Sequence, residues 1–189
     1  MINNDSFEIL KTECSTCQRC GLSSTRRNLV FGVGNEHSDI MFIGEGPGEQ
    51  EDLKGEPFVG PAGQLLDKML ELIGLDRNKV YIANIVKCRP PSNRDPREDE
   101  CEACIPWLKR QIELVDPKII VCLGRIASIR LIDRDFRITK QHGIWYEIEG
   151  RDVIATYHPS ALLRDVDKRP DAFEDFIKIR TKIEENAGR

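Results

Sequence analysis

Residues 38–52 read SDIMFIGEGPGEQED, an apolar run that ends at a glycine and continues as a glycine-rich loop. The apolar residues 40–43 predict a short buried strand. Gly44, Gly46 and Gly48 then indicate a backbone that turns tightly or approaches a ligand closely. Their spacing fits neither the GxGxxG pattern nor the Walker phosphate loop. The stretch therefore predicts a strand that leads into an unusual loop.

Strands and helices alternate further along the chain. VYIANIV at 80–86 and KIIVCLG at 118–124 predict two more short strands. Pro61 suits the first turn of a helix, whose apolar face comprises Leu65, Leu66, Met69, Leu70 and Ile73. A second helix is expected after residue 95, with Asp95 as its N-cap, Pro96 at its first position and Glu98 in its first turn. Pro106 predicts that this helix kinks or restarts.

The last third of the chain predicts a short helix, a hairpin and a final helix. The short helix follows the third strand and buries Ile126, Ile129 and Leu131. GIWYEIEGRDVIATYHPS at 143–160 predicts a hairpin with its turn near Glu149 and Gly150 and its second arm ending at Tyr157 and His158. The final amphipathic helix carries Phe173, Phe176, Ile177 and Ile183. Strands separated by helices predict an α/β fold with a parallel sheet.

Composition places few limits on function. The 189 residues carry a net charge of −4 with 40% hydrophobic and 32% charged residues, which is ordinary for a globular protein and argues mildly against a general nucleic-acid binder. Locally, KCRPPSNRDPR at 87–97 holds four basic residues and one acid. The chain begins without a signal-like segment, and its apolar runs are too short to cross a membrane, so we expect one cytoplasmic domain spanning 1–189. About 12 residues at the amino end and about 6 at the carboxyl end are expected to be peripheral.

Three polar or aromatic side chains stand out near the expected ligand-binding edge. In open α/β sheets ligands bind beyond the carboxyl ends of the strands. Asn84 is the one polar side chain in its strand, and its amide matches a pyrimidine edge; on an edge strand it would instead face water. His158 follows the last strand and can donate to a developing anion, or simply cap its own turn. Phe58 lies in a glycine-bracketed loop and can stack on a planar ligand or anchor the loop to the core.

The seven cysteines predict a metal site, because thiols in a reducing compartment seldom form a disulfide framework. Cys14, Cys17 and Cys20 are evenly spaced near the amino end, and Cys88, Cys101 and Cys104 lie in the middle of the chain. Four thiolates suit tetrahedral zinc or an iron–sulfur cube. Spacing selects neither the metal nor which four of these six cysteines bind it. Cys122, inside an apolar strand, is expected in the core.

Five motifs in one order carry a resemblance to a known family. GEGPGEQED (44–52), GEPFVGPAG (55–63), NIVKCRPPSNR (84–94), IIVCLG (119–124) and YHPSALLR (157–164), together with the cysteines, resemble a family 4 uracil-DNA glycosylase, the iron–sulfur branch of its superfamily. The resemblance covers roughly residues 12–180. It implies a three-layer α/β/α fold with a mostly parallel four-stranded sheet. It also implies an enzyme that hydrolyses the bond between uracil and deoxyribose in single- or double-stranded DNA, acting as a monomer in base excision repair.

The resemblance also implies the site residues. A structural [4Fe-4S] cluster would be bound by Cys14, Cys17, Cys88 and Cys104, with Cys20 and Cys101 as bystanders. Phe58 would stack on uracil, Asn84 would pair with its N3 and O4 edge, His158 would donate to O2, and Gly46 and Gly48 would line the pocket. Gly46 occupies the place of the aspartate that usually positions the water, so we expect Glu45 and Glu51 to compensate, with Glu51 held by Asn93 and Glu45 orienting Asn84. The expected DNA contacts are Lys87, Arg89, Arg94, Ser160, Leu162, Leu163 and Arg164, with the two leucines as the wedge.

Three other readings remain open on the sequence. A non-catalytic iron–sulfur DNA-binding module would share the fold, but Phe58, Asn84 and His158 are all present and favour activity. A related branch crosslinks to DNA through a histidine in an inserted loop, and no histidine lies between His37 and His142. A zinc nucleotide hydrolase would need an open metal position, which four cysteine ligands would fill.

Overall fold

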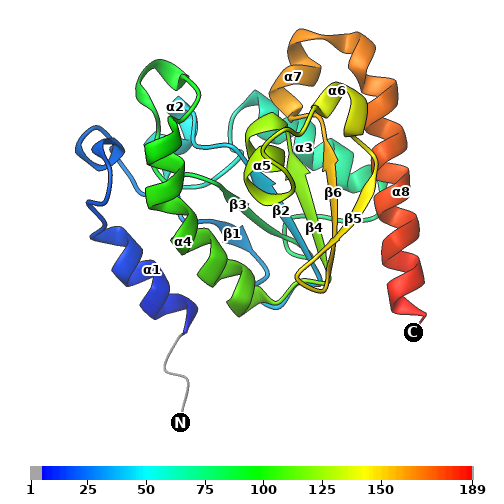
Figure 1. The fold of residues 1–189 in the computed structure, drawn as a ribbon, viewed down its shortest axis with the longest axis horizontal. Helices are drawn as coiled ribbons and strands as arrows, with labels where there is room; N and C mark the ends of the chain where they lie inside the picture. Colours follow the sequence, from blue (N-terminus) through cyan, green and yellow to red (C-terminus); the bar gives the residue numbers. More distant parts are fainter. Residues whose placement is uncertain (1–5, 189) are drawn as a thin grey trace.

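A six-stranded sheet forms the centre of the molecule, for which a computed structural model describes residues 6–188 (Figure 1). The strands run in the order β1 (Val33–Gly34), β3 (Tyr81–Asn84), β2 (Ile40–Gly44), β4 (Ile119–Leu123), β6 (Arg151–Thr156) and β5 (Trp145–Ile148). The central four, β3, β2, β4 and β6, are parallel, and β1 and β5 add antiparallel edges. The predicted parallel core of four strands is therefore confirmed, and β1, only two residues long, was missed.

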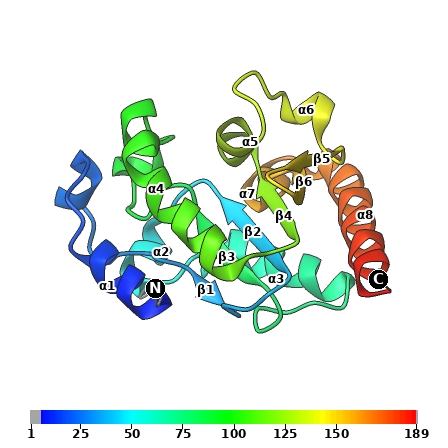
Figure 2. The same cartoon turned by 60° about the horizontal axis from the view of Figure 1, so that its bottom comes forward.

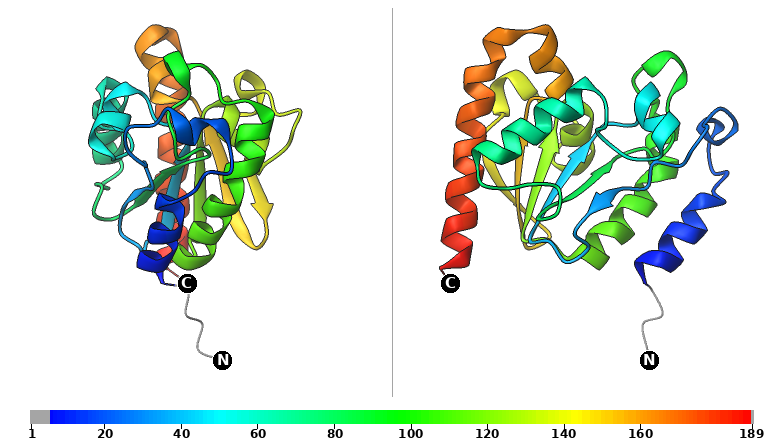
Figure 3. Two further views of the ribbon diagram at one scale, coloured as in Figure 1. Left: turned by 90° about the vertical axis from the view of Figure 1, so that its left-hand side faces the viewer. Right: turned by 180° about the vertical axis from the view of Figure 1, so that it is seen from behind.

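Each face of the sheet is covered by helices, giving three layers. Helices α1 (Phe7–Ser15), α4 (Glu98–Val115) and α5 (Arg125–Leu131) lie on one face (Figures 1 and 2). Helices α3 (Pro61–Leu72), α7 (Pro159–Arg164) and α8 (Arg169–Ala187) pack against the other, and Figure 3 shows α3 and α8 from that side. The shorter elements are η1 (Gly21–Ser24), α2 (Glu49–Lys54), η2 (Pro91–Asn93), α6 (Ile138–Gln141) and η3 (Val166–Lys168).

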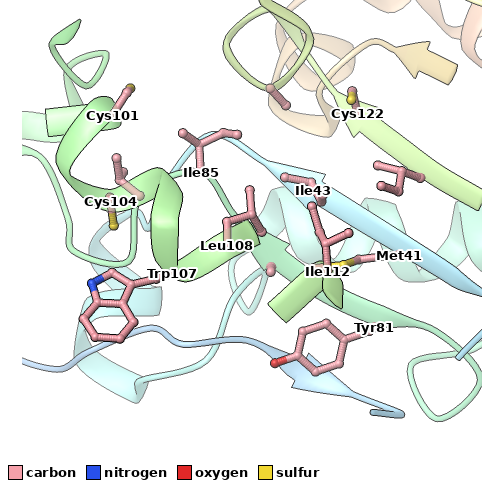
Figure 4. Close-up of a cluster of buried hydrophobic side chains, with 14 of the residues drawn as sticks. Met41, Ile43, Tyr81, Ile85, Cys101, Cys104, Trp107, Leu108, Ile112 and Cys122 are labelled. Atoms are coloured by element: carbon pink, nitrogen blue, oxygen red, sulfur yellow. The ribbon is translucent and has the colours of Figure 1, made fainter. Parts of the chain in front are cut away.

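Alternate strand residues supply the two halves of the core. Met41 and Ile43 of β2 point towards α4, while Ile40 and Phe42 belong to the cluster on the α3 and α8 face. This alternation follows from the two-residue period of a strand, and strands covered on both faces become continuously apolar. Figure 4 shows Leu108 and Ile112 of α4 near Met41, Ile43 and Tyr81, and Cys122 of β4 belongs to the same cluster.

The amino-terminal helix is part of this core, although the first dozen residues were expected to be peripheral. Ser6 caps α1 by accepting a hydrogen bond from the Ile9 amide. Phe7 and Leu10 are buried, and the Phe7 ring packs edge-on against Phe31 and Tyr81. Residues 1–5 lie outside the described range. Because α1 is anchored in this way, Cys14 in its last turn has a fixed position.

Two predictions about α4 were wrong. Its N-cap is Arg97, not Asp95, because the Asp95 carboxylate instead pairs with Arg125 of α5. The helix also continues through Pro106 as one element. Pro106 lies on the exposed face, where water can satisfy the carbonyl that the proline leaves without an amide donor.

The apolar face predicted for α8 was too wide, because it included residues of the exposed side of the helix. Phe176 is buried as expected, but Phe173 and Ile177 are largely exposed, and the buried face runs through Ala172, Phe176 and Ile179. The hairpin turn is where the sequence placed it. Glu149 and Gly150 both have positive φ, at 51° and 75°, as a two-residue hairpin turn requires.

Candidate active site and metal centre

A cavity of about 560 Å³ opens at the carboxyl ends of the parallel strands. Its walls come from the loop after β2, the loop after β3, the turn after β4 and the segment after β6. The motifs that looked unusual in the sequence therefore meet in one place. Of the predicted residues, the cavity is lined by Glu45, Gly46, Gly48, Glu51, Phe58, Asn84, Arg94, His158, Ser160 and Arg164.

Asn84 ends β3 inside this cavity and is only 2% exposed. Its Oδ1 is buried and has no hydrogen-bond partner among the described residues. Gly44, its register partner on β2, makes room for it, because a Cβ on Gly44 would come within 2.5 Å of that oxygen. A buried acceptor without a donor costs roughly 1–3 kcal/mol, so this amide is set for a ligand that supplies the donor.

Phe58 and His158 lie opposite each other at the cavity wall. Their rings are stacked with centroids 5.4 Å apart and planes 29° apart. Phe58 has a positive φ of 54°, an unusual conformation for an aromatic residue, and Arg77 holds it there by donating to the carbonyls of Pro57 and Phe58. Strain of this kind is characteristic of ligand sites.

His158 is held in one tautomer. The Ser160 amide donates to His158 Nδ1 at 3.1 Å, so Nδ1 carries no proton and a neutral ring carries its proton on Nε2. Burial, with a smaller contribution from Arg164, lowers the pKa of His158 to about 4. The imidazole is therefore neutral near pH 7 and presents a single N–H donor.

Glu45 is the carboxylate with an altered pKa in the cavity. Burial, with a smaller contribution from Asp95, raises the pKa of Glu45 to about 7 against the opposing effects of Arg125 and Arg164. The group therefore changes charge near neutral pH, as a general base requires. Among the described residues no hydrogen bond joins Glu45 to the Asn84 amide, so the expected orienting contact between them is not seen.

Glu51 and Asn93 do not pair as expected. Glu51 Oε1 accepts from the amides of Val59 and Gly60 at 3.0 and 3.1 Å, and Oε2 accepts from Gly48 at 3.1 Å. Asn93 Oδ1 accepts from Arg89 instead. Glu51 therefore joins the Gly48 loop to the Phe58 loop. Its acceptor positions are mostly occupied by backbone amides.

Gly46 and Gly48 lie in the cavity wall as predicted. A Cβ on Gly46 would come within 2.6 Å of Val86 Cγ2, so this loop packs directly on the residues that follow β3. The Ile85 and Val86 amides donate to the carbonyls of Gly44 and Glu45, which extends the β2 and β3 pairing beyond the sheet. The loop is therefore held at a fixed distance from Asn84.

The expected basic contacts fall into two classes. Lys87 is 1% exposed, so the prediction that it contacts DNA was wrong. Arg89 and Arg94 are at the surface but are already engaged: Arg89 donates to Asn93, and Arg94 forms a bidentate pair with the buried Glu100. Arg94 holds the pKa of Glu100 at about 2, so this pair stays charged and fixes the loop.

The segment after His158 exposes one leucine to solvent, not two. Leu163 is 43% exposed, whereas Leu162 is 2% exposed and belongs to the core. The prediction of a two-leucine wedge was therefore wrong for Leu162. Ser160 and Arg164 line the cavity as expected. Tyr157, the first residue of the last motif, also lines the cavity. Two further lining residues, Arg125 and Lys168, were missed because they lie among ordinary helix and turn residues.

Five thiols surround a second cavity, between α1, η1, the loop after β3 and α4. They are Cys14, Cys17, Cys20, Cys88 and Cys104. Cys20 was expected to be a bystander but lines this cavity with the others. Cys101 does not, and Figure 4 shows its sulfur pointing away from the side of α4 on which Cys104 lies. Cys122 is in the core, as predicted.

Hydrogen-bond donors surround these sulfurs. Trp107 Nε1 donates to Cys17, Arg26 donates to Cys88, and the Lys87 amide donates to Cys104, at 3.2–3.3 Å. Donors of this kind favour thiolate over thiol. Burial opposes them, raising the pKa of Cys14 to about 12 and of Cys104 to about 11. A metal bound to these thiols would displace their protons.

Among residues 6–188, no group of three or more histidine, cysteine or acidic side chains lies close enough to hold one metal ion. The five thiols nevertheless line one cavity, and four thiolates suit either a tetrahedral ion or an iron–sulfur cube. Four of the five thiols would be enough to bind an iron–sulfur cube.

Comparison with known proteins agrees with this geometry. The family model for the uracil DNA glycosylase superfamily matches residues 31–179. The chain is 49% identical to a type-4 uracil-DNA glycosylase of Archaeoglobus fulgidus, over 93% of this chain and 92% of that one. It is 48% identical to one of Sulfurisphaera tokodaii, over 93% and 84%, and 44% identical to one of Thermotoga maritima, over 94% of both. Within residues 6–188, every helix is too short or too polar to span a membrane.

Proposed function

The chain belongs to the uracil DNA glycosylase superfamily and is a uracil-DNA glycosylase of the type-4 branch, and from that premise we propose how its own residues read and release uracil. The observation that carries the proposal is the buried Asn84 Oδ1, an acceptor without a protein donor in a cavity walled by Phe58 and His158. A base reaches such a cavity only after leaving the DNA stack, at a cost of a few kcal/mol.

Asn84 selects uracil over cytosine. Its Oδ1 accepts from uracil N3–H and its amide nitrogen donates to O4. Cytosine reverses both partners, presenting an unprotonated N3 and an amino group, and so leaves buried polar groups unmatched. The extended pairing with the Gly46 loop fixes the backbone of Asn84 at the end of β3, which holds its side chain in the cavity wall.

His158 stabilises the departing base. When the bond between C1′ and N1 breaks, its electron pair passes to the ring and negative charge gathers on O2. The neutral imidazole, held by Ser160 with its proton on Nε2, donates to that oxygen. A neutral donor is suited to this role because it needs no prior protonation at pH 7, in keeping with the pKa of about 4.

Glu45 positions the water. Water attacks C1′ as the base leaves, and it passes a proton to a nearby base. Glu51 is engaged by three backbone amides, whereas Glu45 lines the cavity with a pKa of about 7. We assign Glu45 as the base and Glu51 as the residue that fixes the two loops.

The thiol cavity holds the cofactor. Cys14, Cys17, Cys88 and Cys104 would bind a [4Fe-4S] cluster, which when present supplies a structural crosslink and not a redox step. Those thiols tie α1 to the loop after β3 and to α4. Since Cys88 lies four residues beyond Asn84, the crosslink braces one wall of the uracil cavity.

Arg164, Leu163 and Ser160 form the contact with the DNA around the flipped base, with Leu163 filling the gap in the stack. Every group of the site comes from one chain, which supports action as a monomer, and the thiol-rich cavity suits the reducing cytoplasm. Both single- and double-stranded DNA are proposed as substrates.

The decisive experiment incubates the protein with an oligonucleotide that contains one uracil, followed by alkali. Strand scission at the uracil is expected, and Asn84→Ala should reduce its rate strongly. A cytosine-containing oligonucleotide should remain intact. Equal scission by Asn84→Ala and the unaltered protein would refute the assigned role.

A further inference from the structure

Lys87 is a fully buried lysine, only 1% exposed. Its ammonium donates to the backbone carbonyl of Asn84 at 2.9 Å and to Gln111 Oε1. A buried cation is retained only where hydrogen bonds or opposite charge compensate for the lost water. These two acceptors supply that compensation, and Lys87 also lines the thiol cavity with Cys14, Cys88 and Cys104.

No neighbouring strand in the described part of the chain donates a hydrogen bond to the Asn84 carbonyl, the group to which Lys87 donates. The edge strand β1 pairs only with Tyr81 and Ile82 of β3 and does not reach Asn84. Beyond β1, the Phe31 carbonyl accepts from Gln111 Nε2 instead of continuing the ladder. Lys87 therefore supplies the donor that a longer edge strand would have given.

The same residue contacts the thiol cavity through its backbone. The Lys87 amide donates to Cys104 Sγ at 3.3 Å, and its carbonyl accepts from Val30 at 2.9 Å. One residue thus joins the thiol cavity to the peptide that carries the uracil-reading side chain. Gln111 fixes the position of the ammonium, because the Gln111 side chain is itself held by hydrogen bonds to Phe31 and Tyr81.

We propose that Lys87 is a positioning residue for the glycosylase reaction: it fixes the Asn84 peptide, and with it the Asn84 amide, to the wall of the thiol cavity. The inference rests on the proposed reading of uracil by Asn84. It explains why a cation occupies the core here. Replacing the ammonium with an apolar group leaves the carbonyl unbound and lets the Asn84 side chain move within the cavity.

The test is a double-mutant cycle with Lys87→Met and Asn84→Ala, using Lys109→Met as a control at an exposed position of α4. Each purified variant is checked for iron per chain, visible absorption and affinity for free uracil by calorimetry. Lys87→Met should retain iron, bind free uracil more weakly and lose about tenfold to hundredfold in kcat/KM. In the Asn84→Ala background the same change should cost less than about threefold, because the side chain that Lys87 positions is gone.

Additive losses in the cycle, or an unchanged kcat/KM in iron-loaded Lys87→Met, would overturn the proposal. If Lys87→Met does not retain iron, Gln111→Met decides by the same cycle, because it leaves Lys87 and every thiol in place while it removes one acceptor of the ammonium, together with the Gln111 bonds to Phe31 and Tyr81. A full rate in Asn84→Ala would instead overturn the proposed reading of uracil. The two failures are therefore distinguishable.

Discussion

Replacing Asn84 with alanine should weaken catalysis far more than it weakens the fold. The side chain is 2% exposed and its Oδ1 has no partner among the described residues, so the folded protein loses no hydrogen bond from that oxygen. The uracil complex loses two, one to N3–H and one to O4. At about 1–2 kcal/mol for each bond in a buried site, the loss in transition-state binding is about 2–4 kcal/mol. That corresponds to roughly 30-fold to 1000-fold in kcat/KM.

The assay measures kcat/KM on a uracil oligonucleotide by alkaline scission, with thermal unfolding measured beside it. Asn78→Ala, which alters an exposed asparagine that does not line the cavity, is the matched control and should retain full activity. The melting temperature of Asn84→Ala should stay close to that of the parent, because removal of an unsatisfied buried acceptor offsets the small void left behind. A loss below threefold, or a loss matched by Asn78→Ala, would refute the reasoning.

Four further outcomes are expected. The rate should rise with pH through about 7 as Glu45 loses its proton, and Glu45→Gln should be slow and lack this inflection; an inflection that persists would exclude Glu45 as the base. Among single serine substitutions, Cys14→Ser should lose iron and Cys20→Ser should keep it, whereas the opposite result would place Cys20 in the ligand set instead. Leu163→Ala should weaken activity on duplex DNA more than on single strands, while Leu162→Ala should chiefly lower the melting temperature; a strand-independent Leu163→Ala would argue against the wedge. DNA affinity should fall steeply with salt, and a flat response would contradict phosphate contacts.

The sequence allowed prediction of those site residues whose position is determined by the end of a strand. Asn84 and His158 follow apolar runs, and the ends of parallel strands lie at one edge of the sheet, so their meeting follows from topology. The cavity confirms that they meet with Phe58. Their individual roles stay predictions, because a fold brings residues together without revealing which atom of a substrate each one contacts.

The sequence could not predict which side chains far apart in the chain contact one another. Lys87 belongs to a charged stretch that suggests a solvated loop, and only the positions of Asn84 and Gln111 show that its ammonium is buried. Asp95 has the pattern of a helix cap, but Arg125 on another helix competes for it. Evenly spaced thiols look alike in a sequence, so the place of Cys20 in the cavity appears only in three dimensions.

The order of the chain has a consequence for how the protein is made. Every cysteine of the thiol cavity lies within the first 104 residues, whereas β6 and His158 are translated later. Cys14, Cys17, Cys88 and Cys104, the proposed cluster ligands, are therefore all synthesised before the segment that carries His158. A chain that stalls before residue 104 displays its early thiols without their last partner.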